Sequence, residues 1–214
     1  TPVTLELGGK SPVIVDAEGA FDSIAPKIAI GKLFNAGQTC IAPDYALVPR
    51  ARIDEFVTAM TRSIGRLYPT LAGNADYTSI VNERHYARLT NLLADARTHG
   101  ARVVEVNPAA EALASSARKV APALILDASD DMAVMREEIF GPLLPVVAYD
   151  SLDDAIGYVN RHERPLALYW FGDHASRRDR VLQGTIAGGV TVNGCLTHFA
   201  QEAQPFGGVG ASGI

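Results

Sequence analysis

Residues 143–172, LLPVVAYDSLDDAIGYVNRHERPLALYWFG, decide the fold class that the sequence predicts. Short apolar runs at 143–149 and 166–172 are bounded by turn residues, which is typical of buried β-strands. The residues between them, 152–161, predict a helix. A strand, a helix and a second strand in this order indicate a parallel pair joined by a crossover, as in α/β proteins.

The same alternation continues toward both ends of the chain. It predicts strands at 13–15, 45–48, 102–106, 120–126 and 189–193, and helices at 51–67, 83–99 and 174–183. Asp22 is expected to cap a further helix, Gly100 to end the helix at 83–99, and residues 107–118 to form a surface loop. We therefore predict one α/β domain, with a mainly parallel sheet covered by helices on both faces.

Composition and charge exclude several classes of protein. With 48% hydrophobic and 20% charged residues, the chain is typical of globular proteins. Its formal net charge of −5 argues against a nucleic acid partner, because phosphate binding needs a concentrated basic surface. Arg177, Arg178 and Arg180 are expected to form a solvated helix face. No apolar stretch suits a membrane span and no secretion signal is evident, so we expect a cytoplasmic protein without membrane contact.

The first candidate for chemistry is Leu5-Glu6-Leu7-Gly8-Gly9-Lys10, where a carboxylate lies in a strand-like apolar run that stops at two glycines. Partial burial there would disfavour the charged form of Glu6 and make it a better proton acceptor. Paired glycines allow a cofactor to approach the backbone closely, or allow a tight turn. Taken alone, the segment is better explained as a strand, a turn and a surface Glu–Lys pair.

The second candidate is Cys40, within Phe34–Pro43, FNAGQTCIAP. A glycine-broken helix end precedes the cysteine and a strand follows it, and functional residues concentrate in such irregular segments. A nucleophilic role requires loop amides or a nearby cation to lower the thiol pKa, because at ~8.5 a free thiol is mostly protonated. A free cysteine is more often a small buried hydrophobe, so this segment alone also favours a structural role. Cys195, at the end of a predicted strand, is assigned no chemistry.

Two other segments contain candidate residues. In Arg136–Pro142, REEIFGP, adjacent carboxylates precede an aromatic residue and a turn, and alone this is best explained as a helix end. A carboxylate can nevertheless accept both hydroxyls of a ribose, and an aromatic ring can border a planar ligand. Pro205–Gly213, PFGGVGASG, is rich in glycine but lacks the spacing of a phosphate loop. The histidines and cysteines show no metal-ligand spacing, so we expect no metal site.

In this order, the four segments resemble those of the aldehyde dehydrogenase superfamily. The family's glutamate motif is similar to residues 5–10, its cysteine motif to 37–40, GQTC, and its cofactor-ribose motif to 138–142, EIFGP. The number of residues between Glu6 and Cys40 is also typical of the family, and the resemblance extends over the whole chain. Residues 37–45 and 206–213 are most similar to the class 3 and coniferyl aldehyde dehydrogenase branch.

The resemblance implies an oxidoreductase that converts an aldehyde to the carboxylic acid with NAD or NADP. It implies that Cys40 is the nucleophile, through a thiohemiacetal and a thioester, and that Glu6 activates water. It further implies cofactor contacts for Glu138, Phe140, Leu7 and Gly8, and a place in the substrate pocket for Phe206. The branch implies an aromatic aldehyde, such as coniferyl aldehyde, or a medium-chain aliphatic one, and a homodimeric full-length protein.

Members of this family are considerably longer than this chain. We therefore expect residues 1–214 to be a catalytic-domain fragment, without the N-terminal dinucleotide-binding domain and the C-terminal oligomerisation segment, and with little or no activity alone. Two alternatives remain. One is a cysteine hydrolase or esterase, in which Cys40 works with another base. The other is a non-catalytic structural protein with the same fold.

Overall fold

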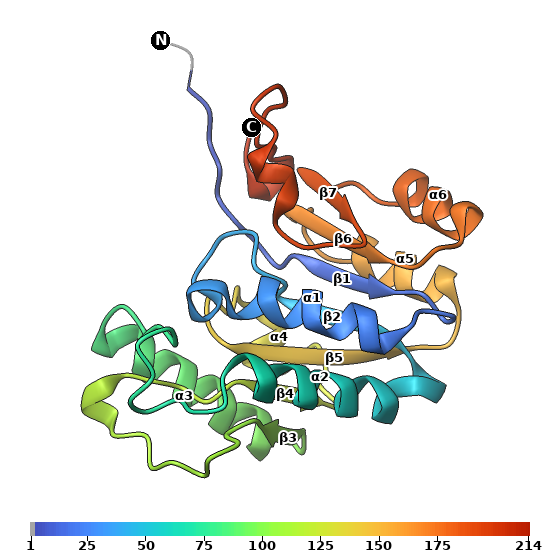
Figure 1. The fold of residues 1–214 in the computed structure, drawn as a ribbon. Helices are drawn as coiled ribbons and strands as arrows, with labels where there is room; N and C mark the ends of the chain where they lie inside the picture. Colours follow the sequence, from blue (N-terminus) through green and yellow to red (C-terminus); the bar gives the residue numbers. More distant parts are fainter. Residues whose placement is uncertain (1–2) are drawn as a thin grey trace.

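The computed structural model describes residues 3–214, which form a seven-stranded sheet with helices on both faces (Figure 1). The strands are β1 Pro12–Val15, β2 Tyr45–Pro49, β3 Arg102–Glu105, β4 Ala123–Leu126, β5 Leu143–Tyr149, β6 Ala167–Phe171 and β7 Gly189–Val192. They lie in the order β3-β4-β5-β2-β1-β6-β7. Only the edge pair β3–β4 is antiparallel among the described pairs, which confirms a mainly parallel sheet.

The helices are α1 Phe21–Leu33, α2 Ile53–Leu67, α3 Glu83–Thr98, α4 Ala133–Arg136, α5 Leu152–Asn160 and α6 Ala175–Gly184. They follow most of the strands, and α1, α4 and α6 lie in the connections between the parallel neighbours β1 and β2, β4 and β5, and β6 and β7. Short 3₁₀ turns occupy Phe34–Gly37, Arg50–Arg52, Ser115–Ala117, Thr197–Ala200 and Gly210–Ser212. Within residues 3–214, no helix has the length and apolar composition needed to cross a membrane.

The sheet has an apolar core on each face, because successive side chains of a strand point to opposite sides. Val13 and Val15 of β1 pack with α1 and α2, which lie across one face (Figure 1). Ile14 between them packs with the core that includes residues of α3, α5 and α6. All three side chains are fully buried, which explains why the strand sequence is continuously apolar rather than alternating.

Two local predictions were wrong. Asp22 does not cap α1, because the helix begins at Phe21 and its N-cap residue, Ala20, makes no side-chain hydrogen bond. Asp22 lies in the first turn and forms an ion pair with Arg62 of α2. The predicted arginine face is only partly solvated, since Arg177 binds Asp16, whose side chain is 3% exposed. The short helix α4 ends at Arg136, in agreement with the helix end expected at 136–142, but its start at Ala133 was not predicted, because four residues are too few to show a helical period.

Other local predictions were correct. Gly100 follows the end of α3 with φ of 90°, a conformation that glycine adopts at little cost. Residues 107–118 contain a single 3₁₀ turn among the described elements and otherwise form a loop. The predicted strand at 143–149 has the bounds of β5.

Candidate active site

The predicted site residues lie at the edge of the sheet where the parallel strands begin. Residues 6–10 precede β1, residues 35–44 precede β2, and residues 137–142 precede β5. We call the second of these stretches the Cys40 loop and the third the Glu138 segment. Ligands of open α/β sheets usually bind at the opposite edge, beyond the carboxyl ends of the strands. The topology alone would therefore direct a search to the wrong edge of this sheet.

The Cys40 loop begins with a sharp change of chain direction. Asn35 and Ala36 adopt left-handed conformations, with φ of 50° and 52°, and Gly37 follows with φ of 78°. A Cβ atom on Gly37 would lie 2.3 Å from the carbonyl oxygen of Gly141, so a side chain cannot fit there. The Cys40 loop is therefore in direct contact with the Glu138 segment.

Gln38 fixes the Cys40 loop, a role that the sequence analysis did not assign. Its buried side chain donates from Nε2 to the carbonyl oxygens of Asn35, at 3.0 Å, and Ser79, at 3.2 Å. Its Oε1 accepts from the backbone amide of Val81 at 2.9 Å. With these bonds the amide side chain connects the loop to residues 79–81, so the backbone around Cys40 is held from a second side.

Cys40 is half-buried, and its thiol does not have the lowered pKa that a nucleophile needs. Burial raises the pKa of the thiol, and the nearby carboxylates of Glu138 and Glu6 raise it further. The backbone amides of Cys40 and Ile41 act in the opposite direction, as expected from the sequence, but do not prevail. The same interactions show that both carboxylates lie within electrostatic range of the thiol.

Glu6 is not in a buried strand, contrary to expectation. The chain around it is extended and pairs with the other end of the sequence, through a bridge from Glu6 to Gly213 and a 2.9 Å bond from the Leu7 amide to the Ser212 carbonyl. Glu6 is exposed, and Leu7 is 60% exposed. The carboxylate of Glu6 is therefore accessible to water in the described chain.

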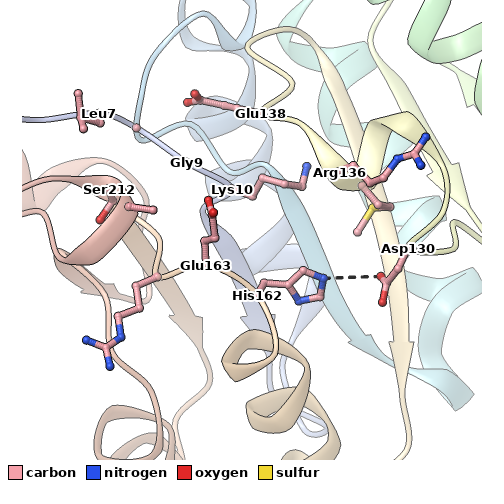
Figure 2. Close-up of a pocket in the computed structure, with 13 residues that line it drawn as sticks. Leu7, Gly9, Lys10, Asp130, Arg136, Glu138, His162, Glu163 and Ser212 are labelled. Carbon is pink, nitrogen blue, oxygen red and sulfur yellow. Dashed lines mark ion pairs between the residues drawn. The ribbon is translucent and has the colours of Figure 1, made fainter.

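Glu138 has the environment that was expected for Glu6. Burial raises the pKa of Glu138 to about 7, and the charge of Asp44 adds to this effect. The Gly9 amide, Lys10 and Arg88 oppose it. The carboxylate turns toward the chain at Leu7 and Gly9 (Figure 2), and a Cβ atom on Gly8 would lie 2.8 Å from Glu138 Oε1.

Lys10 does not form a surface pair with Glu6. It binds Asp44, whose side chain is 4% exposed, and Asp44 accepts the Ile139 amide at 2.9 Å. Lys32, on α1, is 2% exposed, and burial lowers its pKa to about 8, although nearby Asp44 and Glu138 favour its charge. This group of charges was not predictable from the sequence, because its members come from four separate stretches of the chain.

A pocket of about 390 Å³ opens beside Glu138 (Figure 2). Leu7, Gly8 and Glu138, the residues expected to contact a cofactor, line it together with Lys10 and Arg136. Its far side contains the ion pair between His162 and Asp130. The pocket fits a ribose, because the missing side chain at Gly8 leaves the carboxylate of Glu138 open on that side, and a carboxylate can accept two hydroxyls.

The remaining predicted residues do not line this pocket. Neither Cys40 nor Glu6 is among the lining residues. Phe140 is half-buried in the Glu138 segment and has a left-handed backbone, with φ of 50°. Phe206 packs against the same apolar core as Cys40, and its ring lies 6.2 Å from that of His198. Among residues 3–214 there is no cluster of three side chains suited to a metal ion.

The fold and these residues define an α/β protein in which a fixed cysteine loop adjoins a pocket suited to a ribose. The chain matches the family model described as "Aldehyde dehydrogenase family" over residues 1–214. It is 52% identical over 214 residues to a coniferyl aldehyde dehydrogenase of Pseudomonas sp. strain HR199 and to a probable coniferyl aldehyde dehydrogenase of Caulobacter vibrioides. It is 40% identical over 216 residues to a dimeric NADP-preferring aldehyde dehydrogenase of Mus musculus. The chain belongs to the aldehyde dehydrogenase family.

Solved structures agree with this assignment. AldH of Staphylococcus aureus, in a substrate-bound state, matches all of this chain with a TM-score of 0.92 and 41% identity. The Mycobacterium tuberculosis aldehyde dehydrogenase complexed with NAD⁺ matches 99% of it, with a TM-score of 0.86 and 29% identity. An NADP-dependent glyceraldehyde-3-phosphate dehydrogenase of Bacillus halodurans, complexed with NADP, matches all of it, with a TM-score of 0.86 and 28% identity. The chain spans 43–46% of the length of all these proteins.

Proposed function

We propose that residues 1–214 form the catalytic part of an NAD(P)-dependent aldehyde dehydrogenase, which oxidises an aldehyde to its carboxylic acid. The observation that carries this proposal is the position of the Cys40 thiol, within electrostatic range of two carboxylates in different environments. Glu6 is exposed to water, whereas Glu138 is half-buried beside a ribose-sized pocket. These environments suit one carboxylate to activate water and the other to hold a cofactor.

In the first step, the Cys40 thiolate attacks the aldehyde carbon and forms a thiohemiacetal, whose oxygen carries the negative charge. The amides of Cys40 and Ile41, which favour the thiolate, are the donors that this chain offers near the reacting atoms. The Cys40 amide is suited to stabilise the oxyanion, because a fixed backbone donor needs no rearrangement as the charge develops. Gln38 keeps that part of the loop in place.

The cofactor contacts belong to the residues around the pocket. NAD(P)⁺, when bound, supplies the acceptor for the hydride that leaves the thiohemiacetal carbon. Glu138 holds the nicotinamide ribose through its carboxylate, and Phe140 flanks the ring beside it. Leu7 and Gly8 border the same space, where a side chain at position 8 would contact Glu138.

The last step removes the acyl group, which is then a thioester of Cys40. Glu6 takes a proton from water, and the resulting hydroxide attacks the thioester carbonyl. The C–S bond then breaks, the carboxylic acid leaves, and the Cys40 thiolate takes the proton back from Glu6, which restores both side chains. The exposure of Glu6 supports this role, because water reaches the carboxylate without a rearrangement. Phe206, on the same apolar core as Cys40, lines the approach of the substrate.

The substrate that we propose is an aromatic aldehyde such as coniferyl aldehyde, with a medium-chain aliphatic aldehyde as the second choice. The support is the identity with two proteins that are named for coniferyl aldehyde. We also propose that a dinucleotide-binding domain and an oligomerisation segment complete a longer chain, since the relatives are more than twice as long. A homodimer and a cytoplasmic location stay predictions, the first supported by the dimeric murine relative.

The test uses the full-length protein and follows reduction of NAD(P)⁺ by absorbance, with a panel of aromatic and aliphatic aldehydes. Cys40→Ala is expected to lower the rate by about 10³-fold or more, because no other group can form the thioester. Cys195→Ala is the matched control, as the second free cysteine of the chain, and its rate should stay within about twofold of the parent.

Other outcomes would favour the alternatives. Ester hydrolysis that depends on Cys40, without reduction of NAD(P)⁺ by any aldehyde, would indicate a cysteine hydrolase. No turnover of any kind, with equal labelling of Cys40 and Cys195 by iodoacetamide, would indicate a structural protein.

A further inference from the structure

The Glu138 segment has few backbone partners of its own. It connects α4, which ends at Arg136, to β5, which begins at Leu143. Phe140 within it has φ of 50°, and a left-handed residue other than glycine costs about 1–2 kcal/mol. Such a conformation persists only where the surroundings hold it. The position of the Glu138 carboxylate therefore depends on contacts from other elements.

One set of these contacts comes from the stretches that precede β1 and β2. Lys10 donates from Nζ to the carbonyl oxygens of Val134 and Glu137, both at 2.9 Å, and Asp44 accepts the Ile139 amide. Both side chains belong to stretches that lead into the sheet, before β1 and β2. They hold the Glu138 segment on the side that faces the Cys40 loop.

The other set comes from a single residue, Arg88 of α3. Its Nη1 donates to the Glu138 carbonyl and to Glu137 Oε2, both at 3.1 Å, and its Nη2 donates to the Ile139 carbonyl. The guanidinium group thus binds three consecutive residues, which its planar array of donors allows and a lysine ammonium cannot reproduce. The backbone of Arg88 is held in place, because the adjacent Leu89 is fully buried and packs closely against Gly141. A Cβ atom on Gly141 would lie 2.4 Å from Cδ2 of Leu89.

We propose that Arg88 is a positioning residue for the cofactor: it fixes the backbone of the Glu138 segment so that the Glu138 carboxylate stays beside Gly8, ready for the ribose. This inference rests on the proposed function. It predicts a specific pattern, in which loss of Arg88 weakens the binding of NAD(P)⁺. Acyl transfer through Cys40 and Glu6, which needs no cofactor, is expected to continue.

The experiment compares full-length variants at position 88. Arg88→Met removes the charge and the donors, and should raise both the Kd and the KM for NAD(P)⁺ by about tenfold, with kcat changed by less than about threefold. Arg88→Lys keeps the positive charge but loses the planar array of donors, so its Kd and KM for NAD(P)⁺ should lie between those of the parent and Arg88→Met. Hydrolysis of 4-nitrophenyl acetate without cofactor should stay within about twofold of the parent. Arg84→Met, one turn earlier on α3, is the control, because Arg84 is exposed and makes no hydrogen bond or ion pair within residues 3–214.

Each result decides the question. The proposal would be overturned if the Kd and the KM of Arg88→Met for NAD(P)⁺ stay within about twofold of the parent. It would also be overturned if kcat, the rate of ester hydrolysis and the melting temperature of Arg88→Met all fall together, because that result indicates a general structural role. If Arg88→Met does not fold, Arg88→Lys is judged by the same criteria. These outcomes differ from a failure of the proposed function, because in that case the parent protein itself would reduce no NAD(P)⁺ with any aldehyde.

Discussion

The charge on Glu138 acts on Cys40 through space. Because burial raises the pKa of Glu138 to about 7, this side chain changes its charge within the range where an enzyme of neutral pH works. Its carboxylate in turn raises the pKa of the Cys40 thiol. The reactivity of one residue therefore reports the protonation of the other.

Replacing Glu138 by glutamine should make Cys40 more reactive. Above pH 7 the parent carries a negative charge at position 138 that opposes the thiolate, and Glu138→Gln removes it, so alkylation by iodoacetamide should be a few-fold faster. Well below pH 7, Glu138 is protonated and the two rates should converge. Mass spectrometry of the alkylated protein from pH 6 to 9 measures both. A ratio of rates that does not change with pH, or a slower variant, would contradict this coupling.

At the scale of elements, the Cys40 loop and the Glu138 segment interlock. Gly37 lies against the backbone of Gly141, and Gly141 lies against Leu89 of α3. The two loops precede neighbouring strands, β2 and β5, which pair in register over four residues. The sheet thus fixes the ends of both loops that lead into β2 and β5, and the contact between Gly37 and Gly141 joins the loops to each other.

A methyl group at Gly37 should break this contact. Gly37→Ala places a Cβ atom 2.3 Å from a backbone oxygen and forces alanine to a φ of 78°, so we expect a loss of at least about 2 kcal/mol in the free energy of unfolding. Urea unfolding measures this loss. Gly73→Ala is the control, because a Cβ atom there meets nothing within 4 Å, and its effect should lie within about 0.5 kcal/mol. Equal stability of the two variants would show that the loops are not in contact.

At the scale of the whole molecule, buried charges are mostly paired. Asp16 binds Arg177, Asp44 binds Lys10, and the Lys119 ammonium donates to three backbone carbonyls. Lys32 differs, since its side chain is 2% exposed and it forms none of the ion pairs found among residues 3–214. Burial disfavours the charged amine more than nearby Asp44 and Glu138 favour it, which explains the low pKa of Lys32.

Stability should therefore depend on pH through Lys32. The folded state holds its pKa at about 8, against 10.5 unfolded, so between these values the unfolded chain binds more protons and the free energy of unfolding rises with pH. The rise should total about 3 kcal/mol and be absent in Lys32→Met. Urea unfolding of the parent and of Lys32→Met at pH 7.5 to 10.5 measures this rise. The difference between the two proteins removes the contribution of the other titrating groups, which they share. A constant difference between them would contradict the low pKa.

The fold was largely predictable because its strands are buried on both faces. Continuous apolar runs such as 143–149 differ clearly from the amphipathic helices between them, and the bounds of β5 follow from that contrast. Details set by one residue's geometry were not predictable. Asp22 occurs at a helix start, but capping depends on the backbone angles of the residue before the first turn, and Ala20 occupies that place.

The site was less accessible to reasoning from single residues. Cys40 and Glu138 each favoured a structural interpretation, and only the resemblance of the combined motifs to a family suggested chemistry. Glu6 was expected to be buried, but its segment pairs with residues 212–214 outside the sheet. Arg88 is 50 positions from Glu138, and the two meet only because of the tertiary fold. Such contacts have no signal in one sequence.

The two carboxylates near Cys40 also affect what leaves the site. Under the proposed function the substrate is a neutral aldehyde, whereas the product is an anion at neutral pH. The negative charges of Glu6 and ionised Glu138 repel the carboxylate product, just as they disfavour the Cys40 thiolate. The two protein carboxylates that disfavour the Cys40 thiolate therefore also favour departure of the carboxylate product, and so limit product inhibition.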